Sequence, residues 1–486
     1  MAKPILIIGA GLAGSEAAWQ LAERGVKVRL LEMRPLIQTA VHQTANFAEL
    51  VCSNSLKSLD ADSAAGSLKN ELAVMGSGLL SWAIEHQVAA GKALAVDREA
   101  FARSITEALT KHPNIEVIHQ EFTDLASLIE SDTPSIIASG PLTSKALETE
   151  LNQALGSDHL AFFDAAAPIV EADSLDKSQL FSQSRYSEVD GDYLNAPLDR
   201  SQYEQLVQEL AEGQRVIARD FENADLFQAC QPVEELARKG LDTLRYGALK
   251  PVGLLDPRTG RRPWAVIQLR AENRQLSAYN LVGFQTNLTY GEQERIFRLI
   301  PGLEEARFLR FGVMHRNTFL DAPRLITPAL AWRAHPHIHF AGQLSGTEGY
   351  TEAIASGLVA ALAVYAQING QQLTELPAHS LFGALLAYAS DPATQPYQPM
   401  HVNYGLLEPL AEPLRNRKRR YQQYAARADQ AIRAYRESNP ELDWLPELDR
   451  SFLLTDDRGA DQPNEILAGE TNADSVSAAE TSAEAL

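Results

Sequence analysis

The feature that most constrains the fold of this chain is a glycine turn near its N-terminus. Residues 4–32, PILIIGAGLAGSEAAWQLAERGVKVRLLE, have the pattern of an apolar strand, a glycine turn, a helix and a second strand. The turn has the GxGxxG spacing, which permits a sharp bend, close approach of the backbone to a pyrophosphate, and tight packing of helix on strand. The start of the helix offers N–H groups and a positive dipole end to phosphates. The candidate cofactor contacts are Gly9, Ala10, Gly11, Leu12, Ala13, Gly14 and, as acceptor of a ribose hydroxyl, Glu32.

Composition narrows the class of protein. A length of 486 residues favours two domains, and 45% hydrophobic with 22% charged residues is typical of soluble globular proteins. The two cysteines, with no apolar run long enough to span a bilayer and no targeting signal, predict the cytoplasm. A net charge of −20 argues against a generic nucleic-acid binder, although part of it lies in the acidic tail after Thr455.

Later segments indicate that the nucleotide domain is interrupted. Residues 70–80 have helical spacing, and strands are expected at 115–118 and at 135–140, the latter ending in ASG. From about Pro168 the pattern changes to a helix at 198–211 and short strands at 264–269 and 279–284. A strand at 338–343, the segment GTEGY and a helix at 351–366 then resemble the second element of FAD-binding folds, which places backbone amides at the flavin edge. Further helices are expected at 381–389 and 415–436.

The expected fold is therefore α/β, with a Rossmann-like, glutathione-reductase-like FAD-binding domain interrupted by an inserted α+β domain. The expected boundaries are 1–168 and 325–450 for the two parts of the FAD-binding domain, 169–324 for an inserted substrate or tRNA domain, and 451–486 for a disordered acidic tail. The second element adds Gly342, Gln343 and Gly349 as cofactor contacts. Gln343 stands where such folds have an acid and can still hydrogen-bond a ribityl hydroxyl.

The two cysteines lie in polar loops, Cys52 in VCSNSL and Cys230 in ACQPVE. They form no CxxC motif, which disfavours a dithiol reductase. Two isolated thiols suit a nucleophile with a supporting acid or base, but a free cysteine is more often a small buried hydrophobic residue. On the residues alone both interpretations stay open, and no metal site is expected.

Several basic residues have two interpretations. Arg245 and Lys250 follow Cys230 in sequence and form either a solvated loop or an anion or nucleic-acid contact. His315, next to Arg316, is either a core histidine or a stacking partner for a flat ring at the domain junction. The run of residues 415–420, RNRKRR, is either a solvated helix face or a phosphate-tracking patch.

In many blocks the chain resembles the TrmFO family of folate- and FAD-dependent tRNA (uracil-5-)-methyltransferases, within the MnmG/TrmFO flavoproteins. The resemblance covers about residues 4–440 and rests on blocks that include IIGAGLAGSEAAWQLAERG, ELVCSNSLKS, CQPVE, TLRYGALKPVGL, YNLVGFQTNL, FGVMHRNTF and FAGQLSGTEGYTEA. It implies that reduced FAD and 5,10-methylenetetrahydrofolate deliver a methyl group to carbon 5 of the T-loop uridine of tRNA, with NAD(P)H as reductant. The partners implied are the T-arm of tRNA, folate and nicotinamide nucleotides, with no membrane and no obligate protein partner.

The resemblance also assigns roles to residues. Cys230, in the Cys-x-Pro-x-Glu block, inherits the role of nucleophile, and Cys52 inherits a supporting role. His315 is our candidate for stacking on the folate, and Arg245, Lys250 and Arg316 are candidates for contacts with folate or tRNA. The chain departs from the family at Ala229, where glycine is frequent. The alternatives are an MnmG-like enzyme that modifies the wobble uridine, and a non-catalytic tRNA-binding factor that holds FAD.

Overall fold

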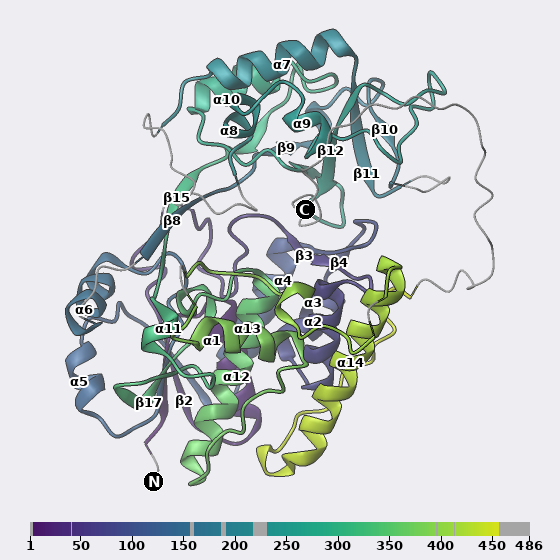
Figure 1. Ribbon diagram of the computed structural model, residues 1–486. Helices are drawn as coiled ribbons and strands as arrows, with labels where there is room; N and C mark the ends of the chain where they lie inside the picture. Colours follow the sequence, from purple (N-terminus) through teal and green to yellow (C-terminus); the bar gives the residue numbers. More distant parts are fainter. Residues whose placement is uncertain are drawn as a thin grey trace.

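Two large β-sheets organise the chain, as the computed structural model shows (Figure 1). The structure describes residues 3–39, 41–155, 160–185, 191–216, 231–394, 397–412 and 414–455, with the backbone alone at 160–165 and 315–318. The first sheet carries the glycine turn, and the second lies in the middle third of the sequence.

The first sheet has the strand order β16-β17-β7-β1-β2-β6 among the described residues. Its neighbouring strands are parallel, apart from the antiparallel pair β16–β17. Because β17 lies two strands from β1, the segment of residues 338–350 returns to the sheet of the glycine turn, as the sequence predicted. The strands are β1 (Ile5–Ile8), β2 (Val28–Glu32), β6 (Ile115–His119), β7 (Ser135–Ile137), β16 (Ala331–Trp332) and β17 (His335–Phe340).

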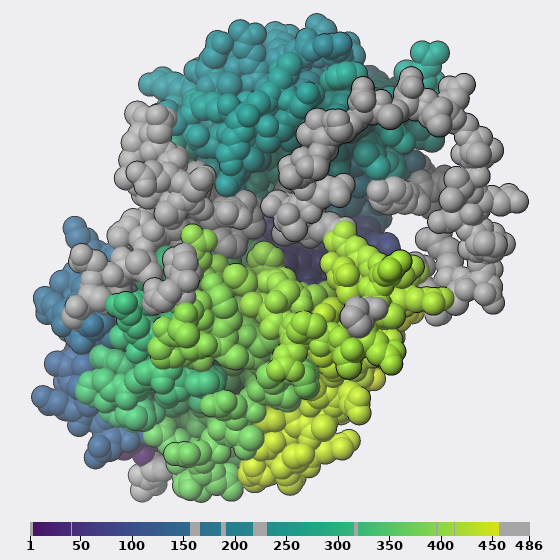
Figure 2. All heavy atoms as spheres, viewed as in Figure 1, coloured from purple at the N-terminus to yellow at the C-terminus, as the bar shows by residue number. Residues whose placement is uncertain are grey.

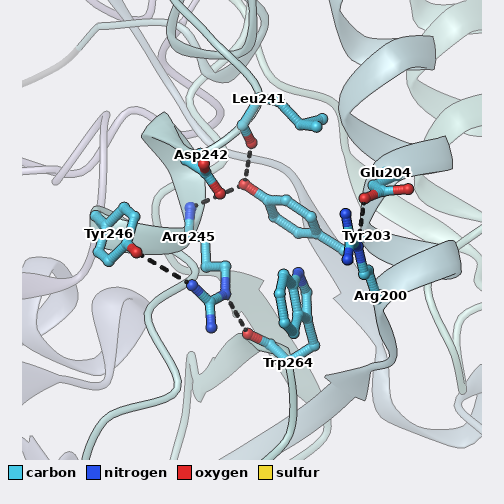
Figure 3. A pocket seen from close by; sticks show the side chains of 8 residues that line it. All are labelled: Arg200, Tyr203, Glu204, Leu241, Asp242, Arg245, Tyr246 and Trp264. Carbon is cyan, nitrogen blue, oxygen red and sulfur yellow. Dashed lines mark hydrogen bonds and ion pairs between the residues drawn. The ribbon is translucent and has the colours of Figure 1, made fainter.

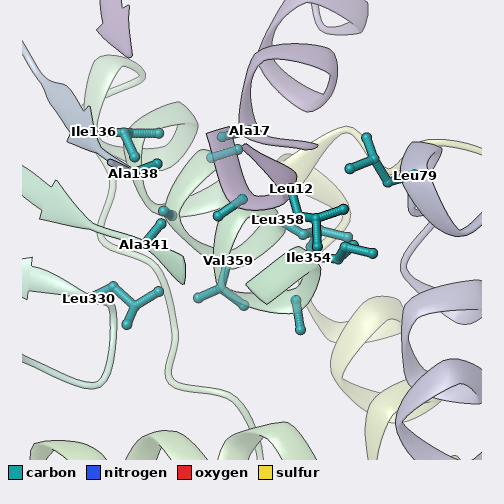
Figure 4. Packing of buried hydrophobic residues seen from close by; sticks show 14 of the residues in the cluster. Leu12, Ala17, Leu79, Ile136, Ala138, Leu330, Ala341, Ile354, Leu358 and Val359 are labelled. Carbon is teal, nitrogen blue, oxygen red and sulfur yellow. The ribbon is translucent and has the colours of Figure 1, made fainter. Parts of the chain in front are cut away.

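Helices α1 (Leu12–Glu23) and α12 (Tyr350–Ile368) pack together at the centre of the larger hydrophobic core. The contact is close because a Cβ atom on Gly357 would lie 2.1 Å from the carbonyl oxygen of Ala13. Figure 4 shows side chains from both helices meeting those of β7 and the segment after β17. Helix α12 is long and apolar enough to cross a membrane, but 83% of its apolar window is buried, as in the core helix of a globular domain.

The remaining elements of this part surround the sheet. A small sheet pairs β3 (Ser55–Ser58), β5 (Ala93–Val96) and β4 (Gln87–Val88). The helices are α2 (Ala64–Val74), α3 (Gly78–Glu85), α4 (Arg98–Lys111), α5 (Leu125–Glu130), α6 (Lys145–Leu155), α11 (Ala322–Leu325), α13 (Leu381–Ser390) and α14 (Arg417–Ser438).

The second sheet is antiparallel, in the order β10-β11-β12-β13-β9-β14, and has its own hydrophobic core. Its strands are β9 (Ile169–Glu171), β10 (Phe181–Ser182), β11 (Tyr193–Leu198), β12 (Ala265–Ala271), β13 (Ala278–Leu281) and β14 (Phe308–Arg310). The helices that accompany it are α7 (Arg200–Glu212), α8 (Val233–Arg238), α9 (Thr243–Tyr246) and α10 (Tyr290–Phe297).

A two-stranded antiparallel ribbon of β8 (Leu160–Ala165) and β15 (Met314–Phe319) connects the two halves of the molecule (Figure 1). The chain leaves the first half along β8 and returns along β15. In the space-filling view, purple atoms of the N-terminal part lie between the teal upper half and the green and yellow lower half (Figure 2).

The structure confirms an α/β fold with a Rossmann-like parallel sheet, and it corrects two details. The expected helix at 70–80 is two helices, α2 and α3, because Gly76 between them has φ of +76°, a left-handed conformation that ends the first helix. Residues 451–455, which we placed in the acidic tail, are joined to the first half, since the N–H of Leu454 donates to the carbonyl of Leu59 at 2.9 Å. Residues 456–486 lie outside the described residues.

Candidate functional site

The three glycines of the turn serve different needs. Gly9 has φ of +97°, and a Cβ there would lie 2.5 Å from the carbonyl oxygen of Ala138 at the end of β7. A Cβ on Gly14 would lie 1.8 Å from the carbonyl oxygen of Gly9. A Cβ on Gly11 would meet no atom of the described residues within 4 Å. Gly9 and Gly14 are therefore required by the fold, whereas Gly11 leaves open space at the N-terminus of α1, where a phosphate can approach the backbone.

Glu32 ends β2 beside the turn and is buried. Its Oε2 accepts a hydrogen bond from the N–H of Ala10 at 2.9 Å, and its Oε1 accepts from Nε of Arg34 at 2.8 Å. Burial would raise the pKa of Glu32, but the hydrogen bond and charge of Arg34 outweigh it and hold the pKa below its ordinary value. Arg34, which the sequence analysis did not single out, thus keeps Glu32 ionised as a hydrogen-bond acceptor.

The second candidate cofactor-binding element, residues 338–350, lies against the glycine turn. Gly342, at the end of β17, has φ of +75°, and a Cβ there would lie 3.2 Å from Cβ of Ala13 in α1. Gln343 donates from Nε2 to Oε2 of Glu348 at 2.5 Å. Gly349, with φ of +118°, precedes α12. Since β1 and β17 are parallel to the same strand, α1 and α12 begin at the same edge of the sheet, where α/β folds bind dinucleotides.

Cys52 lies in a loop whose backbone N–H groups are bound by the side chain of Tyr350, the first residue of α12. The Tyr350 hydroxyl accepts hydrogen bonds from the N–H of Cys52 at 2.8 Å and of Ser53 at 3.2 Å. Burial and the neighbouring Cys52 raise the pKa of Tyr350, so its hydroxyl stays protonated at neutral pH. The cysteine loop therefore lies at the start of α12, beside the second cofactor-binding element.

Two arginines bind backbone carbonyl groups of the same loop. Nη1 of Arg98, in α4, donates to the carbonyl of Leu50, and Nη2 of Arg310, in β14, donates to that of Val51 at 2.6 Å. Arg98 is also paired with Glu272 of the second half, with 3.0 Å between Nε and Oε2. Both halves of the molecule thus fix the backbone that precedes Cys52.

The pKa values of these two arginines are shifted in opposite directions. Burial would lower the pKa of Arg98, but the Glu272 carboxylate raises it above its ordinary value. Burial and the charge of Arg98 lower the pKa of Arg310. The cysteine loop thus lies next to two positive charges of which one is neutralised by an ion pair, an arrangement suited to an anionic group.

A third set of contacts joins the loop to the second half through Asn54. Its Nδ2 donates to the carbonyl of Ala271 at 2.9 Å, and its Oδ1 accepts from Nε of Arg270 at 2.8 Å. Asn54 is fully buried. The end of β12 and the CSNS block therefore form one continuous junction.

The structure describes only the end of the block that contains the other cysteine. Cys230 itself lies outside the described residues. Glu234, at the start of α8, is buried and accepts from the Thr286 hydroxyl at 2.8 Å and from the N–H of Asn287 at 2.6 Å. Burial raises the pKa of Glu234 to about 7. These bonds join the described end of the CQPVE block to the FQTNL block.

His315 and Arg316 lie in β15, in the ribbon between the two halves, as expected for residues at a domain junction. Their side chains lie outside the described part of the structure. Their contact with a ligand therefore stays a prediction.

Arg245 lies at a cavity of the second half rather than in a solvated loop (Figure 3). Its guanidinium carbon is 3.9 Å from the centre of the Trp264 ring, and its Nε donates to the Trp264 carbonyl at 3.1 Å. Lys250 is half-buried, and its carbonyl accepts from Nη1 of Arg185 at 2.8 Å. The basic residues 417–419 are exposed in the first turn of α14 and Arg420 is half-buried; α14 begins on the side of the molecule that faces the second half (Figure 1).

The sequence analysis missed Arg34, Arg98, Arg310 and Tyr350. Arg34 stands two residues after Glu32 and could have been found by its proximity to that acid. The other three converge on Cys52 from distant parts of the chain, and the sequence pattern gave no signal for that convergence. No cluster of His, Cys, Asp or Glu suited to a metal ion occurs among the described residues.

Comparison with known proteins gives the family. The model described as "Glucose inhibited division protein A" matches residues 4–372. Over 428 residues the chain is 51% identical to the methylenetetrahydrofolate--tRNA-(uracil-5-)-methyltransferase TrmFO of Moorella thermoacetica, covering 88% of this chain and 97% of that protein. The TrmFO of Heliobacterium modesticaldum is 49% identical over 435 residues, covering 90% and 98%.

Among solved structures, the fold is similar to that of Aquifex aeolicus GidA in its form II crystal. The TM-score is 0.63 at 14% sequence identity, with 90% of this chain and 75% of that chain covered. From the family match over most of its length and these levels of identity, the chain belongs to the glucose inhibited division protein A family and, within it, to the TrmFO proteins.

Proposed function

We propose that this protein methylates carbon 5 of the T-loop uridine of tRNA, as a methylenetetrahydrofolate--tRNA-(uracil-5-)-methyltransferase. The observation that carries the proposal is 44–51% identity, over most of both chains, to relatives that have this name. In the net reaction, the methylene carbon of the folate replaces the hydrogen on carbon 5 as a methyl group. NAD(P)H supplies the reducing hydride, one proton is taken up from solvent, and tetrahydrofolate and NAD(P)⁺ are released.

The residues around the glycine turn fit FAD. The open space at Gly11 and the N-terminus of α1 suit the pyrophosphate, and the ionised Glu32 suits a ribose hydroxyl. Gly342, Gln343 and Gly349 at the same sheet edge suit the ribityl and flavin end. Bound there, FAD would supply the redox chemistry that converts a methylene to a methyl group.

The cysteines have separate roles in this proposal. Cys230 is the nucleophile that adds to carbon 6 of uracil, because carbon 5 becomes nucleophilic only after such an addition. Cys52 supports it from the junction of the two halves, where Tyr350, Arg98 and Arg310 hold its backbone. His315 and Arg316 on the connecting ribbon are the candidates for contact with the folate.

We assign the cofactor and the substrates to the parts of the chain that carry the two different sheets. We propose that residues 1–168 and 325–450 form the FAD-binding domain, and that residues 169–324 form an inserted domain for folate and tRNA. The segment 238–262, which contains Arg245 and Lys250, and the basic start of α14 are the candidate tRNA contacts in a chain whose net charge is −20. The cytoplasm, where tRNA and reduced cysteines occur together, is the proposed location.

The test is the position and identity of the product. The purified protein is incubated with unmodified tRNA, methylenetetrahydrofolate, FAD and NADH or NADPH, and the tRNA is digested and analysed by mass spectrometry. The proposal predicts 5-methyluridine in the T-loop fragment. A modified wobble uridine instead would favour an MnmG-like activity, and unmodified tRNA would favour a non-catalytic factor.

A further inference from the structure

A cavity of about 240 Å³ lies in the second half of the molecule, between α7, α9 and the residue before β12 (Figure 3). Its volume is sufficient for one planar ring system. Arg200 and Tyr203 of α7, Arg245 and Tyr246 of α9, and Trp264 lie around it.

Four planar side chains in this cavity form a stack, which we call the Tyr246–Arg200 stack. The guanidinium carbon of Arg245 is 5.5 Å from the Tyr246 ring centre and 3.9 Å from that of Trp264. The guanidinium carbon of Arg200 is 5.3 Å from the Trp264 ring centre. Figure 3 shows the order, with Tyr246 at one end and Arg200 at the other. Tyr246 is 70% exposed, so the stack is open at that end.

The charges that line the cavity are partly paired. Arg200 is paired with Glu204, with 2.7 Å between Nε and Oε1, and Asp242 is a second carboxylate of the lining. Arg245 lies between the Tyr246 and Trp264 rings. This side of the cavity, where Arg245 lies next to the exposed Tyr246 ring, therefore suits a ligand with a flat ring and anionic or carbonyl oxygens.

This cavity is remote from the cysteine loop. Trp264 precedes β12, and the Ala271 carbonyl at the other end of that strand accepts from Asn54. At a rise of about 3.3 Å per residue, the strand separates the two places by roughly 20 Å. A ligand that reaches both places is therefore a macromolecule or an extended chain.

Local charge favours RNA as that ligand. Residues 238–264 contain seven Lys or Arg residues and two Asp or Glu residues, in a chain with a net charge of −20. Proteins that bind unpaired RNA use exposed aromatic rings and arginine planes for the bases and cations for the phosphates.

We propose that this cavity is a second RNA subsite, which binds an unpaired nucleotide of the tRNA substrate away from the methylated uridine. The base stacks on the exposed Tyr246 ring at the open end of the stack, and the lysine and arginine side chains of residues 238–262 bind the adjacent phosphates. The proposal rests on the proposed function, since it takes tRNA as the substrate.

The test measures binding of a fluorescently labelled, unmodified tRNA transcript to the FAD-loaded full chain by anisotropy, at one fixed salt concentration. Tyr246→Ala removes the stacking surface and is expected to weaken binding about tenfold. Tyr246→Phe keeps the ring and should bind like the wild type. Tyr290→Ala, which removes another exposed tyrosine ring of the second half, is the matched control and should bind like the wild type.

The results of these binding measurements distinguish failure of the RNA subsite from failure of the proposed methyltransferase function. If the wild type does not bind the transcript, the proposed function fails. If the wild type binds and Tyr246→Ala binds equally well, the RNA subsite is wrong and the proposed function stands. If Tyr246→Ala instead raises the KM for methylenetetrahydrofolate without changing tRNA affinity, the cavity binds the folate and the RNA subsite is again wrong. Circular dichroism confirms that each variant is folded, which is expected because Tyr246 is exposed.

Discussion

At the scale of the residue, Gly14 is required by the packing of the fold, whereas Gly11 leaves the space that the proposed cofactor site needs. A methyl group on Gly14 would overlap the backbone of Gly9, whereas one on Gly11 would point into open space. The GxGxxG spacing could be recognised from the sequence, but the separate roles of these glycines depend on what surrounds each one. That information comes only from the packed structure.

This difference gives the first prediction. Gly11→Ala should keep the thermal midpoint of the apoprotein close to that of the wild type but weaken FAD binding at least about tenfold, because the added methyl group occupies space next to the helix N-terminus. Gly291→Ala, at another open position in the second half, is the control and should leave both properties unchanged. FAD titration followed by visible absorbance, with calorimetry of the apoprotein, measures the two effects. Wild-type FAD affinity in Gly11→Ala would show that the turn does not hold the cofactor.

The second prediction concerns the Arg98–Glu272 pair, whose side chains are 12% and 7% exposed. Removing one partner of a buried pair typically costs about 3–5 kcal/mol, since the other charge stays buried without compensation. Arg98→Met and Glu272→Met should each lower the urea midpoint strongly, and the double variant should lose less than the sum of the single changes. Additive losses would mean that the two side chains do not interact in solution.

At the scale of the element, Glu71 joins two helices that are far apart in sequence. Glu71 in α2 accepts hydrogen bonds from the N–H groups of Leu381 at 2.6 Å and Phe382 at 3.1 Å, in the first turn of α13. Burial raises the pKa of Glu71 to about 8. The carboxyl group is therefore protonated in the folded protein at a pH where it is ionised in the unfolded chain.

This shift gives the third prediction. Because the folded state binds more protons than the unfolded state between about pH 4.5 and 8, the contribution of Glu71 to stability is full below that window and is lost as pH rises through it. Glu71→Gln cannot ionise, so its stability relative to the wild type should increase from pH 5 to pH 8. Unfolding in urea at several pH values measures this difference. A difference that does not change with pH would show that Glu71 does not carry the raised pKa.

The sequence predicted elements well where the signal is local. The strands β1 and β2 and the helices α7, α12 and α14 lie where apolar periodicity placed them, within a few residues at each end. The break between α2 and α3 was missed because Gly76 can be accommodated in a helix pattern and only its left-handed φ ends the helix. The β8–β15 ribbon was also missed, because its strands are paired across a long insertion and no local pattern specifies that pairing.

At the scale of the whole molecule, the candidate site is assembled from segments that the chain keeps far apart. Arg98, Arg310 and Tyr350 converge on the Cys52 loop from α4, β14 and α12. The cysteine loop could be predicted from its sequence block, but not the three side chains that hold it. Their convergence depends on how the second half docks on the first, which is a property of packing and not of periodicity.

Surface charge at this scale gives the fourth prediction. Arg417→Gln with Arg419→Gln removes two exposed charges from the start of α14 and should lower tRNA affinity and reduce the slope of log K against log salt by up to about two. Stability should change little, because these side chains are exposed. Filter binding of tRNA over a range of salt concentrations measures the slope. An unchanged slope would exclude the start of α14 from the tRNA contact.

Transfer of a one-carbon unit from folate to tRNA is the activity that we propose for this protein. It is tested most directly with methylenetetrahydrofolate that is isotopically labelled in the methylene carbon, incubated with the FAD-loaded protein, NADH or NADPH and unmodified tRNA. The predicted result is label in 5-methyluridine of the T-loop, dependent on reductant and lost in Cys230→Ala. Absence of label from that nucleotide, with the protein folded and FAD bound, would contradict the claim.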